Sequence, residues 1–104
     1  MSLTVDRVVD GKKQIFKLKG ILDFSTVDSF DVDSHSFEMI EEFEVDFSEL
    51  EFIDSTGIGA ILSILHKASS LNADVQFSGM SLETIDLFET IGVFDIKKSL
   101  FGGV

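Results

Sequence analysis

Two hydroxyl residues, Ser55 and Thr56, stand between an aspartate and a glycine in the segment DSTGIG at residues 54–59. A serine in such a place can act as a catalytic nucleophile, cap a helix or accept a phosphate group. Each role makes different demands on the neighbouring residues. Those neighbours decide which role the sequence favours.

A nucleophilic serine needs a base that can take its proton. The histidines of the chain are His35 and His66. His66 follows Ser55 by about three helical turns, at ~1.5 Å per residue, which is too far along one helix for contact. Spacing leaves His35 open, but the G-x-S-x-G pattern of a hydrolase is absent. We therefore expect a protein that is not an enzyme.

The segment also lacks the features of a nucleotide or metal site. Gly57 and Gly59 are not accompanied by the further glycines and the lysine of a phosphate-binding loop. Asp31, Asp33 and His35 carry ligand atoms, but a calcium loop needs a glycine turn and a distal glutamate at fixed positions. We expect no cofactor and no metal, and a solvated acidic loop at residues 31–35.

Helix capping explains a hydroxyl at the start of a helix, because its oxygen accepts a backbone N–H and stabilises the helix by about 1 kcal/mol. Capping does not explain why glycines follow at positions 57 and 59. Glycine within a helix lowers the stability of the helix by about 1 kcal/mol relative to alanine. Glycines allow another backbone, or a partner, to come close. The segment therefore has the features of a contact surface as well as those of a cap.

Charge is unevenly distributed in this chain of 104 residues and net charge −11. Twelve acidic residues and no lysine or arginine lie between Asp23 and Asp54. A phosphate backbone or an anionic membrane would repel such a surface, so neither is favoured as a partner. An acidic run is most often a solvated face, and the alternative is a docking surface for a basic protein.

The composition predicts a cytoplasmic protein. Hydrophobic residues make up 44% of the chain, enough for one core, and there is no cysteine for a disulfide framework. No window approaches the roughly 18 to 20 apolar residues of a membrane span. The N-terminus lacks a basic segment followed by an apolar run, so we expect no signal peptide and no direct membrane insertion.

The hydroxyl pair lies where a strand pattern changes to a helix pattern. Phe43, Val45 and Phe47 alternate with polar residues, which predicts a strand with one wet face. From residue 58 the apolar residues recur at the three-and-four spacing of a helix that faces a core. This stripe contains Ile58, Ile61, Leu62, Leu65 and Ala68.

Before this point, residues 3–9 and 13–18 are predicted to form two strands, joined by a tight turn at Asp10 and Gly11. A helix capped by Ser25 or Thr26 is then expected, and it would run through Phe30, Phe37, Met39 and Ile40.

After the helical stripe, residues 73–77 predict another strand. Ser81 can cap a short helix that ends at Gly92, with Leu82, Ile85 and Phe88 facing inward. Residues 93–97 predict a last short strand, followed by a frayed end. The order β-β-α-β-α-β-α-β predicts a single α/β domain over residues 1–104, with a mixed four- to five-stranded β-sheet and helices packed mainly on one face.

Three segments resemble the STAS domain family of anti-sigma factor antagonists. FIDSTGIGAIL at residues 52–62 resembles the family signature, in which an aspartate precedes a phosphorylatable serine at a helix start. LKGILDFST at residues 18–26 resembles the strand-to-helix segment with its acidic residue. LFETIGVFDI at residues 87–96 resembles the closing helix, turn and strand.

The resemblance implies that Ser55 is the phosphate acceptor, with Asp23 and Asp54 as nearby carboxylates and Thr56 as its neighbour. The partner-binding surface would comprise Asp23, Asp54, Ser55, Thr56, Gly57, Ile58 and Gly59. The implied partners are an anti-sigma factor that is also a serine kinase using ATP, and a metal-dependent serine/threonine phosphatase acting on phosphorylated Ser55. Unphosphorylated protein would bind the anti-sigma factor and free a sigma factor.

STAS-like domains also occur as soluble subunits of membrane transport complexes, where the helix after the serine docks on an ATPase subunit. The full D-S-T-G-I-G match favours the antagonist over this alternative. The sequence departs from the family in its short, acidic region between Asp23 and Asp54. We also expect it to lack the C-terminal helix that family members generally add.

Overall fold

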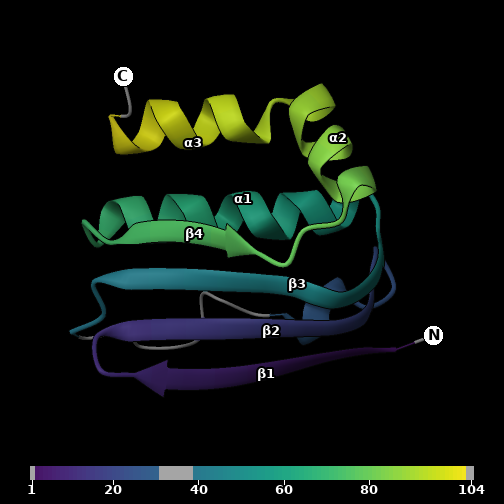
Figure 1. The fold of residues 1–104 in the computed structure, drawn as a ribbon, viewed down its shortest axis with the longest axis horizontal. Helices are drawn as coiled ribbons and strands as arrows, with labels where there is room; N and C mark the ends of the chain where they lie inside the picture. Colours follow the sequence, from purple (N-terminus) through teal and green to yellow (C-terminus); the bar gives the residue numbers. More distant parts are fainter. Residues whose placement is uncertain (1, 31–38, 103–104) are drawn as a thin grey trace.

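The computed structural model describes residues 2–30 and 39–102. The described elements are β1 (Leu3–Asp10), β2 (Lys13–Leu22), the short 3-10 helix η1 (Val27–Ser29), β3 (Glu42–Ile53), α1 (Ser55–Ser70), β4 (Asp74–Ser78), α2 (Leu82–Ile91) and α3 (Val93–Phe101). They form an α/β fold with one four-stranded mixed sheet (Figure 1). The predicted fold class is confirmed.

The strand order β1-β2-β3-β4 brings the carboxyl ends of three strands to one edge of the sheet. β1 and β2 pair antiparallel through the predicted turn, where Gly11 has a positive φ of 61°. β2 with β3 and β3 with β4 pair in parallel, so all three run toward the same edge (Figure 1). The first turn of α1 begins at this edge, directly after β3.

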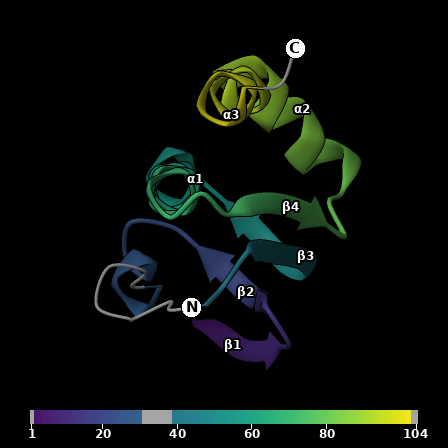
Figure 2. The same cartoon turned by 90° about the vertical axis from the view of Figure 1, so that its left-hand side faces the viewer.

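α1 packs its apolar stripe against the sheet, as the helical spacing predicts. Figure 2 shows α1 and η1 on the same face, with α2 and α3 beyond β4. Phe43, Val45 and Phe47 of β3 belong to the same core. The buried residues of α1 are Gly57, Ile58, Ile61, Ile64, Leu65 and Ala68. Leu62 packs against the core as predicted, but it is only half-buried at the margin of the stripe. Ile64, which the prediction left out, is fully buried.

The last predicted strand is wrong, because residues 93–101 form the helix α3. Gly92 ends α2 with a left-handed φ of 91°, and its carbonyl then accepts the N–H of Ile96 and starts a new helix. Val93 is buried, and Ile96 and Leu100 pack against the core at helical spacing. The expectation that a C-terminal helix is missing is wrong for the same reason.

The helix predicted after Ser25 or Thr26 is wrong for the residues that the structure describes. Only Val27–Ser29 form a helix there, and it is a single 3-10 turn. Met39 has a positive φ of 66°, and Ile40 lies outside any helix. The remaining part of that prediction, and the proposed acidic loop at residues 31–35, fall outside the described residues.

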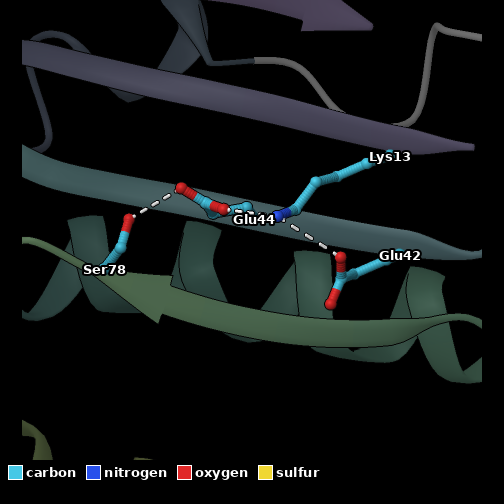
Figure 3. Close-up of polar contacts among 4 residues, drawn as sticks. All are labelled: Lys13, Glu42, Glu44 and Ser78. Atoms are coloured by element: carbon cyan, nitrogen blue, oxygen red, sulfur yellow. Dashed lines mark hydrogen bonds and ion pairs between the residues drawn. The ribbon is translucent and has the colours of Figure 1, made fainter. Parts of the chain in front are cut away.

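The sheet face opposite α1 is polar around β3, which confirms the expected wet face. Lys13 of β2 lies 2.9 Å from Glu44 Oε1 and 3.4 Å from Glu42 Oε2 (Figure 3). Ser78 of β4 donates its hydroxyl to Glu44 Oε2 at 2.9 Å. These contacts from Lys13 and Ser78 lower the pKa of Glu44. Three strands are therefore linked by side chains on this face.

Candidate functional site

The two segments singled out in the sequence meet at the carboxyl edge of the sheet. Leu22 pairs with Ile53, and the N–H of Asp54 donates to the carbonyl of Leu22 at 3.2 Å. The loop that begins at Asp23 therefore lies beside the start of α1 (Figure 1). Leu22 and Ile53 are thirty-one positions apart in the sequence, and they share this edge because β2 and β3 are parallel neighbours.

Asp54 is the N-cap of α1. Its backbone is extended, and its Oδ1 accepts the N–H of Gly57 at 2.9 Å. This hydrogen bond satisfies one of the donors left unpaired at a helix start. Neither hydroxyl of the pair is therefore needed as the cap.

Ser55 and Thr56 are the first two residues of α1, and both are exposed. Within the described part of the chain, neither hydroxyl makes a hydrogen bond. A hydroxyl that caps a helix or supports a loop would have a partner. Both hydroxyls are thus open to solvent at the positive end of the helix dipole.

The two glycines have different structural roles. A Cβ on Gly57 would lie 2.5 Å from the carbonyl oxygen of Leu22 and 2.8 Å from its Cγ. The close contact of α1 with the end of β2 therefore requires glycine at this position. A Cβ on Gly59 would meet nothing within 4 Å, so the described residues do not require glycine there.

Asp23 holds its own loop together. Its Oδ1 accepts the backbone N–H of Ser25 at 2.9 Å and the Ser25 hydroxyl at 2.7 Å, with Thr26 Oγ1 at 3.4 Å. The hydroxyl of Ser25 is the main reason that the pKa of Asp23 is lowered. The residue is only 8% exposed, so Asp23 supports the loop beside α1 and offers little surface to a partner.

The predicted site residues divide into a surface set and a supporting set. Ser55, Thr56 and Gly59 are exposed, and Asp54 is half-buried. The supporting residues, packed beneath the surface set, are Asp23, Gly57 and Ile58, and the last of these is 2% exposed. A partner would reach the surface set directly.

Three apolar residues at this edge are exposed, and the sequence analysis missed two of them, Phe24 and Phe52. The inward orientation predicted for Leu82 is wrong, because Leu82 is the first residue of α2 and its side chain is exposed. Phe24 is 77% exposed, Phe52 54% and Leu82 81%. They come from the loop after β2, the end of β3 and the start of α2. The exposure of Phe52 could have been predicted from alternation along β3. Phe52 is an odd number of residues from Phe43 and Val45, so its side chain points to the opposite, outward face.

Several arrangements are absent from residues 2–30 and 39–102. No group of three or more His, Cys, Asp or Glu side chains could hold a metal ion there. No helix in the same ranges is long and apolar enough to cross a bilayer. One hollow of about 470 Å³ lies between β4 and α3, but no residue of α1 lines it.

The chain belongs to the STAS domain family, whose model matches residues 4–101. This finding confirms the resemblance seen in the sequence. No curated protein matches the chain.

Solved structures share the fold. One is the unphosphorylated form of the anti-sigma factor antagonist SpoIIAA, with a TM-score of 0.68 and 19% identity over 84% of this chain and 81% of that chain. The phosphorylated form of the Bacillus cell fate determinant SpoIIAA has a TM-score of 0.66 and 18% identity, covering 89% of this chain and 86% of that one. A sulfate transporter family protein from Wolinella succinogenes has a TM-score of 0.74 and 20% identity, covering 85% and 73%.

Proposed function

We propose that this protein is an anti-sigma factor antagonist that acts by partner switching under the control of Ser55 phosphorylation. The observation that carries the proposal is the exposed, unbonded Ser55 hydroxyl in the first turn of α1, beside a cap supplied by Asp54. The acceptor serine can therefore be modified without removing a hydrogen bond that the helix needs.

The unmodified surface is the one that the partner recognises. An anti-sigma factor that is also a serine kinase would bind over Ser55, Thr56 and Gly59, releasing a sigma factor. The kinase transfers the γ-phosphoryl group of ATP to Ser55 Oγ, the hydroxyl proton is removed by a base of the kinase, and ADP is formed. This chain is then a substrate of the kinase, and it is not an enzyme.

Phosphate on Ser55 is compatible with the helix and unfavourable for the complex. The helix N-terminus supplies free N–H donors and a positive dipole end, so the helix tolerates the new charge. The phosphate adds roughly −1.5 to −2 charge and three strongly hydrated oxygens, which would have to be desolvated at the interface. A metal-dependent serine/threonine phosphatase would reverse the change by hydrolysing the phosphate ester.

A second function is supported by the likeness to the Wolinella sulfate transporter family protein. In this alternative, the chain is a soluble subunit of a membrane transport complex and docks α1 on an ATPase subunit. Its binding would then be independent of the modification of Ser55.

The test is binding of the cognate serine kinase to four forms of the protein: unmodified, Ser55→Ala, Ser55→Asp and Ser55-phosphorylated. We expect tight binding of the first two, weaker binding of Ser55→Asp, and loss of at least tenfold in affinity on phosphorylation. Ser99→Ala, at an exposed serine of α3 outside the proposed surface, serves as the matched control and should bind like the wild type. Equal affinity of the unmodified and phosphorylated forms would contradict the proposal and favour the transport subunit.

A further inference from the structure

A groove lies beside the start of α1, between the end of β3 and the first turn of α2. It has a volume of about 350 Å³. Its lining residues are Leu50, Glu51, Phe52, Ile53, Ser81, Glu83, Thr84 and Leu87. Ile53 lines the groove and also lies next to Gly57 of the candidate site. A Cβ added to Gly57 would lie 2.8 Å from Ile53 Cγ1.

The groove has apolar walls and an acidic rim. Leu50, Ile53 and Leu87 are half-buried or buried, and Phe52 stands 54% exposed. Glu51 and Glu83 are both exposed, and none of the lining residues is basic. An exposed aromatic ring beside an apolar hollow is typical of a protein interaction surface.

The two hydroxyl groups of the groove are already engaged. Ser81 Oγ accepts the N–H of Thr84 at 3.1 Å and lies 3.0 Å from Thr84 Oγ1, an arrangement that caps α2. Glu51 and Glu83 have no ion-pair partner among the described residues. The carboxylates are therefore the groups available to an incoming ligand.

We infer that this groove receives an apolar side chain of the partner protein that is flanked by a lysine or arginine. The apolar side chain fills the space between Phe52 and Leu87, and the cation lies against Glu51 and Glu83. The inference rests on the proposed function, since it supplies a second anchor for the partner that binds over Ser55. A phosphate on Ser55 disturbs one anchor and leaves the residues of the groove unmodified.

The experiment measures binding of the kinase that modifies Ser55 to two groove variants, Phe52→Ser and Glu83→Lys. The matched controls are Val9→Ser, at a 61% exposed apolar position on the distant strand β1, and Glu89→Lys, an exposed glutamate about 9 Å further along α2. We expect at least tenfold weaker binding for each groove variant and changes below twofold for the controls. All four variants keep Ser55 and the other residues of the proposed partner-binding surface.

The outcomes separate the groove from the proposed function. A kinase that modifies Ser55 but binds both groove variants as tightly as the wild type would overturn the groove inference alone. If no kinase modifies Ser55, the proposed function fails, and the groove is tested by selecting binders from a random heptapeptide library. Recovery of apolar peptides with lysine or arginine that do not bind Glu83→Lys would support the groove. Recovery of no binders, or of binders insensitive to Glu83→Lys, would overturn it.

Discussion

At the scale of single residues, the candidate site depends on which atom caps α1. Because Asp54 supplies the cap, the Ser55 hydroxyl is free for modification. Gly57 allows the helix to approach Leu22, whereas Gly59 faces open space. Glycine at an exposed position where the fold does not require it, beside the proposed acceptor serine, favours a role in binding.

The two glycines should respond differently to alanine. Gly57→Ala places a Cβ against the Leu22 carbonyl, so we expect a loss of stability of about 1 to 3 kcal/mol. Gly59→Ala should raise stability by up to about 1 kcal/mol, because alanine has the higher helix propensity. Urea denaturation of the pair checks both values. Equal midpoints for the two variants would contradict the different roles assigned to these glycines.

Asp23 should contribute to the pH dependence of stability. Its folded-state pKa is lowered below the usual 3.8, chiefly by the Ser25 hydroxyl, so its stabilising effect is full above that value and is lost as the pH falls below it. Asp23→Asn keeps an oxygen acceptor but does not titrate. The stability difference between wild type and Asp23→Asn should therefore shrink between pH 7 and pH 3, as measured by urea midpoints. A difference that stays constant with pH would mean that Asp23 does not act through its charge.

At the scale of elements, parallel pairing of β2 with β3 brings the Asp23 loop to the first turn of α1. Alternation predicted β3, and the three-and-four spacing predicted α1. The segment at residues 93–97 was harder, because five apolar and charged residues without a clear period fit a short strand as well as a helix. The helix is favoured because it lets Val93, Ile96 and Leu100 pack on the core. This tertiary contact cannot be seen in the local sequence pattern.

The stripe of α1 can be tested at two adjacent positions. Ile61 is fully buried, so Ile61→Ala should cost about 2 to 5 kcal/mol in unfolding free energy. Leu62 is half-buried, so Leu62→Ala should cost clearly less. Chemical denaturation of both variants gives the comparison. A larger loss for Leu62→Ala would mean that α1 presents a different face to the sheet.

At the scale of the whole molecule, the edge that carries Ser55 combines exposed apolar residues with acidic ones. Five of the eight basic residues lie on β1, β2 and the turn between them, namely Arg7, Lys12, Lys13, Lys17 and Lys19. Glu51, Asp54 and Glu83 lie at the edge that carries Ser55. The sequence predicted the acidic excess, but the fold was needed to show which acids share an edge with Phe24, Phe52 and Leu82.

Association with a basic partner should therefore depend on salt. Screening shortens the reach of exposed charges, so the association rate should fall between low and physiological ionic strength. Stopped-flow or surface-based kinetics with the cognate kinase measure this rate. If the rate and the affinity stay constant over this range, the acidic residues form only a solvated face and do not take part in binding.

The position of the added phosphate decides whether Ser55 is the acceptor. The unmodified protein is incubated with the cognate kinase and ATP, and the products are analysed by intact mass and tandem mass spectrometry of peptides. We predict a single added phosphate, located on Ser55, which is absent in Ser55→Ala and retained in Thr56→Ala. Phosphate on Thr56, or none on the wild-type protein, would contradict the account.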